Sequence, residues 1–331
     1  MVEEKPIQFA PVPLPRFDPT ENNLTSLRTD IHRWVTSPPL VALIELFGAT
    51  MPNSDLSTTF SFLETLSAEH WDFRSGSERN MARTNEYSLR DVSVILAAAE
   101  ALGMVRSLSP GKGAFDHVLI LGGLLRACIL RPRAAARLIR EGLIIGEVSA
   151  LSAFRPLLGD EIELADRAGM SAVNTELEAM DVGVRRSFDL STHPYEAGES
   201  HAANPNESWI VRQYETLNGI AVQVVAAPSS QPEVRRANSA DTFSFWASEL
   251  SHIKPYEKVL LVTSTIYAPF QHCDAIRTLG LAHRLDIHTV GADPRLATED
   301  FLQQRFTPSN YLQEVRSAIR SLKALSIAIE D

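Results

Sequence analysis

Cysteine is scarce in this sequence, since its 331 residues contain only Cys128 and Cys273. Neither belongs to a Cys-x-x-Cys pair or to another spacing that is typical of metal ligands. Two cysteines cannot form a disulfide framework in a chain of this length, and a reducing compartment is therefore expected. The cysteine content favours a cytoplasmic protein.

Long apolar runs are also missing. The longest, near residues 118 to 125, is far shorter than the roughly 20 residues needed to cross a bilayer. The chain begins MVEEKPIQFAPVPLPRF, which is acidic and rich in proline and lacks the basic start and apolar core of a secretory signal. We expect a cytoplasmic protein without a membrane partner.

Positive charge is in deficit, with 31 Lys and Arg residues against 41 Asp and Glu residues and a formal net charge of -10. Such a molecule repels nucleic acids and anionic membrane surfaces, so no nucleic-acid partner is expected. The 44% of hydrophobic and 22% of charged residues are ordinary for a globular protein and exclude disordered and collagen-like classes.

Several catalytic and binding motifs are absent. The dinucleotide pattern GxGxxG does not occur, and the GKG at residues 111 to 113 lacks the other residues of a P-loop. There is no HExxH, and the nine histidines follow no metal-ligand spacing, so no metal is predicted. No GxSxG nucleophile elbow occurs. These absences exclude the standard nucleotide-binding loops and several classes of hydrolase.

The pattern along the chain predicts three parts. Residues 1–22 contain five prolines and are expected to form an extended arm, whereas the periodicity of residues 23–112 is helical. Residues 113–331 alternate apolar strands with helices, which is typical of a parallel sheet; the strands are expected at 117–121, 143–148, 258–264 and 284–291. The predicted fold class is α/β, a Rossmann-like parallel sheet with flanking helices and an N-terminal helical portion.

A polar segment and a hairpin are expected between the second strand and the later ones. Residues 189–208 are turn-rich and without period, and they predict either a long surface loop that acts as a lid or a disordered insertion. The runs 208–215 and 219–228 flank an Asn-Gly pair, Asn218-Gly219, which indicates a hairpin turn.

The loops beyond the carboxyl ends of the strands are the expected binding site, because ligands of open parallel sheets lie there and helix N-termini point into that crevice. The candidate ligand-binding residues are Gly122, Gly123, Arg126, Ser152, Arg155, Arg235, Arg236, Asn238, Thr242, Thr263 and Ser264. Four arginines at this edge of an acidic molecule favour a small anionic or zwitterionic ligand. The alternatives are scattered surface arginines and, for residues 238–242, a helix-capping box.

Tyr267 and Glu147 are the candidate catalytic residues. Tyr267 follows the strand that ends at Ser264 and can take part in proton transfer, or it can simply pack its ring on the domain. Glu147 is a carboxylate within an apolar strand, so it is either an edge residue or a functional acid with a raised pKa.

The order of these motifs resembles the YdcF/SanA-like family of bacterial proteins. The similar pieces are VLILGG at 118–123, RRANSADT at 235–242 and VLLVTS at 259–264, within a stretch of about 115–325. The resemblance implies a Rossmann-like sheet with a helical accessory portion. Because a member of that family is thought to bind S-adenosylmethionine, it also implies this cofactor.

Together these observations predict a cytoplasmic small-molecule enzyme that binds a nucleotide-like ligand, S-adenosylmethionine, for group transfer or rearrangement. Two alternatives remain open. One is a ligand-binding or regulatory protein without catalysis, and the other is a hydrolase or transferase of phosphorylated sugar or envelope precursors. The sequence does not rank substrates and does not define the oligomeric state.

Overall fold

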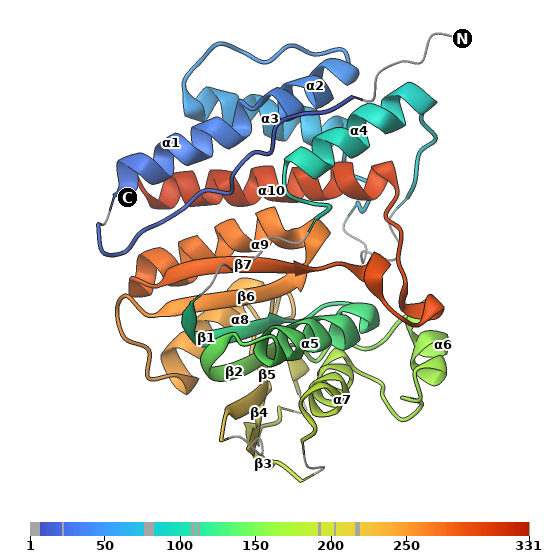
Figure 1. Ribbon diagram of the computed structural model, residues 1–331, viewed down its shortest axis with the longest axis vertical. Helices are drawn as coiled ribbons and strands as arrows, with labels where there is room; N and C mark the ends of the chain where they lie inside the picture. The colour runs from blue at the N-terminus through green and yellow to red at the C-terminus, as the bar shows by residue number, and fades with distance from the viewer. Residues whose placement is uncertain are drawn as a thin grey trace. The chain divides into compact units, whose positions relative to one another are not determined.

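A computed structural model of the chain describes residues 7–21, 23–75, 83–106, 110, 113–190, 193–201, 203–215 and 219–330. The chain forms two compact units (Figure 1). The helical unit comprises Met1–Leu108, Thr265–Arg277 and Arg305–Asp331, and the sheet unit comprises Ser109–Ser264 and Thr278–Gln304. The helical unit is therefore built from three separate stretches of sequence.

The helical unit packs its helices around apolar side chains. The helices of this unit are α1 (Leu24–Val35), α2 (Pro38–Leu46), α3 (Leu56–His70), α4 (Leu89–Ala101), α9 (Ala268–Ala275) and α10 (Pro308–Ala328). Ser88 is the N-cap of α4, and its side chain accepts a hydrogen bond from Asp91 N. Trp34, Phe60 and Trp71 are fully or almost fully buried. Among the described residues, no helix has both the length and the apolar character that a membrane span requires.

The sheet unit contains a mixed, mostly parallel sheet of seven strands in the order β3-β4-β5-β2-β1-β6-β7. The strands are β1 (Ala114–Leu121), β2 (Ile144–Ser152), β3 (Tyr195–Glu199), β4 (Trp209–Glu215), β5 (Ala221–Ala226), β6 (Lys258–Ser264) and β7 (Asp286–Ala292). The pairs β1-β2, β1-β6, β2-β5 and β6-β7 are parallel, and β3-β4 and β4-β5 are antiparallel. The predicted fold class is confirmed.

Helices flank this sheet, namely α5 (Leu125–Arg140), α6 (Asp160–Arg167), α7 (Glu176–Phe188) and α8 (Ser239–Phe245), which continues as a π-helical stretch Trp246–Leu250. Alternate residues of a strand point to opposite faces. Val148 of β2 shares a hydrophobic core with Met180 of α7, whereas the next residue, Ser149, accepts a hydrogen bond from Trp246 Nε1. Helix α7 and the π-helical stretch therefore cover opposite faces of β2.

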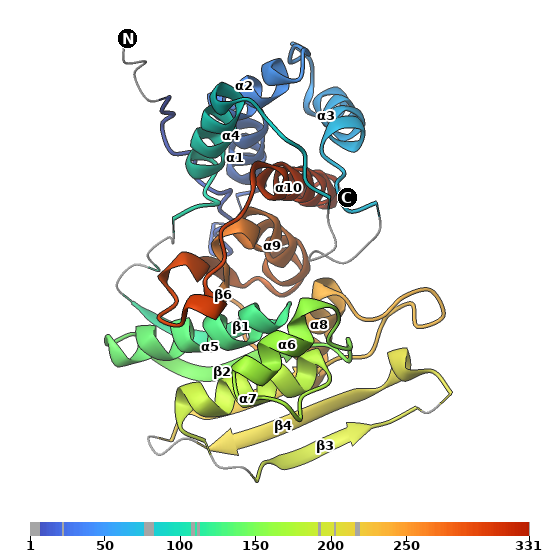
Figure 2. The same ribbon diagram turned by 90° about the vertical axis from the view of Figure 1, so that its right-hand side faces the viewer.

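The middle of the polar segment 189–208 forms a strand and is not an unstructured loop. Tyr195–Glu199 forms β3 and pairs with β4, and Figure 2 shows the two strands side by side at the edge of the sheet. A lone edge strand lacks the apolar alternation of a buried one, and the ion pair of Glu196 with Arg212 (2.9 Å) supports the pairing instead. The antiparallel pair β4-β5 confirms the expected hairpin, although Asn218 of its turn lies outside the described residues.

Candidate functional site

The chain adds β2 on one side of β1 and later adds β6 on its other side. The topological switch point of the sheet therefore lies between the carboxyl ends of β1 and β6. Arg131 of α5 lies there with only 1% of its surface exposed. It donates through Nε to Ser264 Oγ (3.2 Å) and through Nη1 to the Leu121 carbonyl (2.7 Å) and that of Gly122. Arg131 was not predicted as a site residue. Its position three residues after the apolar Cys128 places it on the same face of the helix, which is the sequence signal for its burial.

Arg155 is held by two carboxylates of the sheet unit. Its Nη1 and Nη2 donate to the two oxygens of Glu161 at 2.7 and 2.9 Å, and its Nε donates to Glu176 Oε2 at 3.0 Å. All three side chains are at most 8% exposed. Burial raises the pKa of Glu176, and the charge of Arg155 opposes that shift. Arg155 therefore neutralises buried carboxylates rather than presenting its guanidinium to solvent.

Glu161 also caps the helix that follows β1. Its Oε1 accepts a hydrogen bond from Leu125 N (2.8 Å), in the first turn of α5. The N-terminus of this helix is where dinucleotide-binding folds hold a phosphate group. A carboxylate of the protein itself thus satisfies a backbone donor that would otherwise face an anionic ligand.

Close packing explains the glycine pair after β1. A Cβ atom on Gly122 would lie 2.3 Å from Glu176 Oε1 and 2.6 Å from the Leu151 carbonyl oxygen. On Gly123 it would lie 3.2 Å from the Cβ of Ala127. Gly122 is therefore required for packing against the buried Glu176.

The other expected ligand-binding residues are distributed among several local structures. Arg126 pairs with Asp160 (3.4 Å), and Ser152 Oγ donates to the Val225 carbonyl (2.9 Å). At the start of α8, Arg235 pairs with Asp241, Asn238 forms a capping box with Asp241, and Thr242 Oγ1 donates to the Ser239 carbonyl (2.9 Å). Thr263 is fully buried near the end of β6, and Arg236 is exposed. The structure brings Gly122, Gly123, Arg155 and Ser264 together at the strand ends with Arg131 and Glu176. The start of α8, where Asn238 and Asp241 form the capping box and Arg235 pairs with Asp241, forms a separate local group.

Tyr267 belongs to the helical unit, where it ends a short 3-10 turn. Its ring makes an edge contact with Phe306, with the ring centroids 6.4 Å apart. Glu147 belongs to the sheet unit.

Glu147 lies on a central strand, because β2 pairs with β1 and β5, so it is not an edge residue. Its Oε1 lies 2.9 Å from His117 Nδ1, and Glu257 Oε2 lies 3.0 Å from His117 Nε2. Burial alone lowers the pKa of His117, but the hydrogen bonds and charges of the two carboxylates outweigh it and raise that pKa above its ordinary value. Burial raises the pKa of Glu257, and the hydrogen bond from His117 reverses this to a net lowering. We describe this group as the Glu-His-Glu bridge.

The bridge predicts a dependence of stability on pH. The raised pKa of His117 means that its contribution is complete below the unfolded value of about 6.5 and is lost as the pH rises through the folded pKa. The lowered pKa of Glu257 means that its contribution is lost as the pH falls through its folded value. In an NMR titration, the His117 pKa should lie above about 6.5 and fall in Glu257→Gln. A His117 pKa below 6 in the wild type would contradict the bridge.

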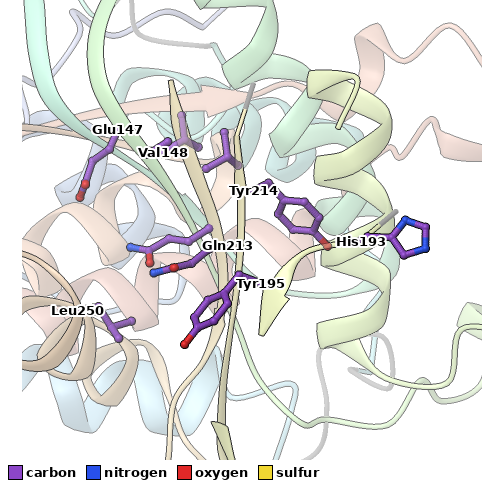
Figure 3. A pocket seen from close by; sticks show the side chains of 10 residues that line it. Glu147, Val148, His193, Tyr195, Gln213, Tyr214 and Leu250 are labelled. Carbon is purple, nitrogen blue, oxygen red and sulfur yellow. The ribbon is translucent and has the colours of Figure 1, made fainter. Parts of the chain in front are cut away.

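A pocket opens on the sheet face beside Glu147. Its volume is about 560 Å³, which is in the range of small-molecule sites. It is lined by Glu147, Val148, His193, Tyr195, Gln213, Tyr214, Ala221, Val222, Gln223 and Leu250. In Figure 3 the side chains of Glu147, Gln213 and Tyr195 point to one side of the strands, and Tyr214 points to the other. We call it the sheet-face pocket.

The strand register explains how the polar side chains of this pocket come together. Ser149 of β2 is paired with Gln223 of β5, Gln223 with Gln213 of β4, and Gln213 with Tyr195 of β3. Paired residues share a face of the sheet, so these four side chains form one row across four strands. Gln223 Nε2 lies 2.8 Å from Ser149 Oγ, which holds that amide in place. Polar residues at alternate positions of apolar strands were the signal for this row.

Apart from its tyrosines, the ionisable side chains that line the pocket are the Glu147 carboxylate and the His193 imidazole. Its ten residues include the carboxylate of Glu147 and no lysine or arginine. Glu147 Oε1 accepts from His117 and also from Ser251 Oγ (3.4 Å), whereas Oε2 has no hydrogen-bond partner among the described residues. With one third of the Glu147 side chain exposed, this oxygen is available to a ligand.

No metal site is found in the part of the chain that the structure describes, because no three side chains of the metal-binding kinds are arranged to hold an ion. In the Glu-His-Glu bridge both ring nitrogens of His117 already lie within hydrogen-bond distance of a carboxylate. The sheet-face pocket, with a volume of about 560 Å³, has room for an organic molecule of cofactor size.

Comparison with known proteins gives a relative over the whole length. The chain is 30% identical to the uncharacterized protein Rv3785 of Mycobacterium tuberculosis (strain ATCC 25618 / H37Rv), across 99% of this chain and 96% of the relative. The chain belongs to the Rv3785 family. Residues 18–103 match the model of the Rv3785 N-terminal domain. The uncharacterized protein Mb3814 of Mycobacterium bovis (strain ATCC BAA-935 / AF2122/97) shows the same identity and coverage. No solved structure matches the chain.

Membership of the Rv3785 family corrects the resemblance to the YdcF/SanA-like family, which is wrong. That resemblance was based on apolar strands, a glycine turn and the order of helices over about 115–325. Such features recur in many unrelated α/β sheets, because every buried parallel strand followed by a helix requires them. The whole-chain relationship extends instead through the N-terminal helices.

Proposed function

We propose that this member of the Rv3785 family binds a small organic cation in the sheet-face pocket, with Glu147 as its counter-ion. The observation that carries the proposal is a pocket of about 560 Å³ whose lining includes the Glu147 carboxylate and neither lysine nor arginine. A carboxylate with one free oxygen in a partly enclosed site favours a positively charged partner.

The other side chains of the pocket suit a cation that also carries a ring. Tyr195 is 70% exposed on the edge strand, and its ring can stack on a flat group or face a positive charge. Gln213 and Gln223 each offer both donors and acceptors. Leu250 adds apolar surface. These groups together recognise the ring, the polar edge and the charge of one ligand.

The Glu-His-Glu bridge supports the same assignment. His117 lies between Glu147 and Glu257, so the bridge contains two carboxylates and at most one positive charge, that of a protonated imidazole. The bridge therefore has a net negative charge and fixes the direction of the Glu147 side chain. This arrangement favours binding of a cation, and Glu147 acts as a ligand anchor and, in an enzyme, as the acceptor of a substrate proton.

S-adenosylmethionine is one member of this ligand class, because it carries a sulfonium, an ammonium and a flat adenine ring. The family resemblance that implied it is overturned, so here its support is chemical only. The small anionic ligand was expected from the arginines, but Arg155 is paired with Glu161, and Arg235, in its separate group at the start of α8, is paired with Asp241. The cation in the sheet-face pocket therefore replaces it in this proposal.

Calorimetric titration tests the proposal. The probes are S-adenosylmethionine, thiamine and choline, each beside a neutral counterpart, which for S-adenosylmethionine is S-adenosylhomocysteine with its uncharged sulfur. We expect at least one cation to bind the wild-type protein and to bind Glu147→Gln about tenfold or more weakly, since a charge-assisted contact is lost.

The matched control is Glu141→Gln, an exposed glutamate that follows α5 and pairs with Arg137. It changes the net charge by the same amount as Glu147→Gln and should leave the affinity unchanged. Equal affinities in the wild type and in Glu147→Gln would overturn the proposal. So would the absence of heat with every cation.

A further inference from the structure

A second, smaller cavity of the sheet unit carries the opposite charge. Its volume is about 230 Å³, and it lies between α5, α7, the end of α6 and the segment that follows β7. It is lined by Ile129, Arg133, Arg167, Ala168, Met170, Gly183, Arg186, Glu299, Phe301 and Leu302. We call it the arginine pocket.

The three guanidinium groups of this pocket are held in place by other parts of the protein. Arg186 donates from Nη1 to the Ala168 carbonyl (2.8 Å) and from Nη2 to the Gly169 carbonyl (2.7 Å), at the end of α6. The Arg167 guanidinium lies over the Phe301 ring, 5.0 Å from its centroid. Arg133 donates from Nη1 to Glu299 Oε2 at 2.8 Å. Preorganised guanidinium groups bind an anion without a further loss of side-chain freedom.

The charge of the pocket is not balanced. Glu299 is its single carboxylate against three arginines, and neither Arg167 nor Arg186 pairs with a carboxylate among the described residues. The hydrogen bond from Arg133 and a second one from Thr298 lower the pKa of Glu299 to about 2, so this carboxylate is charged at neutral pH. Three positive charges and one negative charge leave a net charge of two, which matches a dianion.

The remaining lining is apolar. Ile129, Met170, Phe301 and Leu302 face the same cavity as the arginines. Gly183 also lines the cavity, and the backbone of α5 approaches α7 closely there, since a Cβ atom on Gly183 would lie 1.9 Å from the Cys128 carbonyl oxygen. A ligand of this cavity therefore combines a doubly charged group with a small apolar part.

We propose that the arginine pocket is a second binding site, specific for a phosphomonoester with a small apolar group. Phosphate oxygens accept the paired N–H donors of guanidinium, which makes arginine the usual partner of a phosphate dianion. The Glu299 carboxylate pairs with Arg133 and competes with the ligand for it.

A calorimetric titration with phenyl phosphate at low salt tests this site. We expect the wild type to bind phenyl phosphate and Arg167→Gln to bind it about tenfold more weakly, because Arg167 has no carboxylate to release. Glu299→Gln should bind about threefold or more tightly, because the competing negative charge is gone. Inorganic phosphate should bind more weakly than phenyl phosphate, since it lacks the apolar part.

The control is Arg137→Gln, which removes the same charge from an exposed position on α5 outside the pocket. An equal loss of affinity in Arg137→Gln and Arg167→Gln would show a general effect of charge and overturn the site. No heat with phenyl phosphate in the wild type would also overturn it. Glu147→Gln should leave this titration unchanged, so the two proposed sites fail or succeed separately.

Discussion

Arg155→Ala is expected to lower the free energy of unfolding by about 3–5 kcal/mol, because it leaves two buried carboxylates without their partner. Arg155 makes three hydrogen bonds to Glu161 and Glu176, and all three side chains are at most 8% exposed. Part of the loss is offset by protonation of Glu176, whose pKa is already raised by burial. Urea unfolding followed by circular dichroism measures the change.

Arg126→Ala is the control for this prediction. Arg126 also pairs with a carboxylate, that of Asp160 at 3.4 Å, but the Asp160 side chain is 56% exposed. An exposed pair contributes about 0–1 kcal/mol, so this variant should unfold nearly as the wild type does. A loss below about 1 kcal/mol in Arg155→Ala would contradict the assignment of Arg155 as the partner of buried charges.

Gly183→Ala is expected to destabilise the sheet unit by about 3 kcal/mol or more, since overpacking at a rigid contact forces two helices apart. A Cβ atom at Gly183 would lie 1.9 Å from the Cys128 carbonyl oxygen and 3.0 Å from its carbon. The obstacle is the backbone of α5, which cannot rotate away as a side chain can. The same variant should weaken phenyl phosphate binding, because Gly183 lines the arginine pocket.

Gly113→Ala is the matched control, because nothing lies within 4 Å of a Cβ atom placed there. Its free energy of unfolding should stay within about 0.5 kcal/mol of the wild-type value. Should Gly183→Ala unfold at the same urea concentration as Gly113→Ala, the close approach of α5 and α7 would be refuted.

Much of the fold could be predicted because the main strands are buried on both faces. A short apolar run between turn residues, such as residues 117–121, is typical of a strand that is buried on both faces. The structure places this run in β1. The edge strand β3 could not be predicted from YEAGE, because its stability comes from pairing with β4 and not from burial of its own side chains. The apolar spacing within α10 is that of a helix, but it does not indicate the unit in which this helix packs.

The candidate site was predicted less well than the fold, for a reason that concerns charge partners. The arginines at the strand ends were visible in the sequence, but the carboxylates that neutralise Arg155 come from the starts of α6 and α7. Glu147 was found because a carboxylate within an apolar strand is unusual. Its partners His117 and Glu257 lie on other parts of the chain, and the strand register that joins His117 to Glu147 is not visible from spacing.

The row of pocket side chains has the same origin. Gln213, Gln223 and Tyr195 stand on three different strands, and the antiparallel register of β3, β4 and β5 places them side by side. Alternation within each strand indicates a polar position, but it does not indicate which strand is the neighbour. Sequence reasoning therefore finds single residues of such a site and not the pocket.

The most direct test of the account is a crystal structure of the protein soaked with the cation that binds most tightly in calorimetry. The account predicts electron density for the ligand in the sheet-face pocket, with its positive group within hydrogen-bond or ion-pair distance of Glu147 Oε2 and its ring near Tyr195. Density for the same cation at the strand ends beside Gly122 and Ser264, with the sheet-face pocket empty, would contradict it.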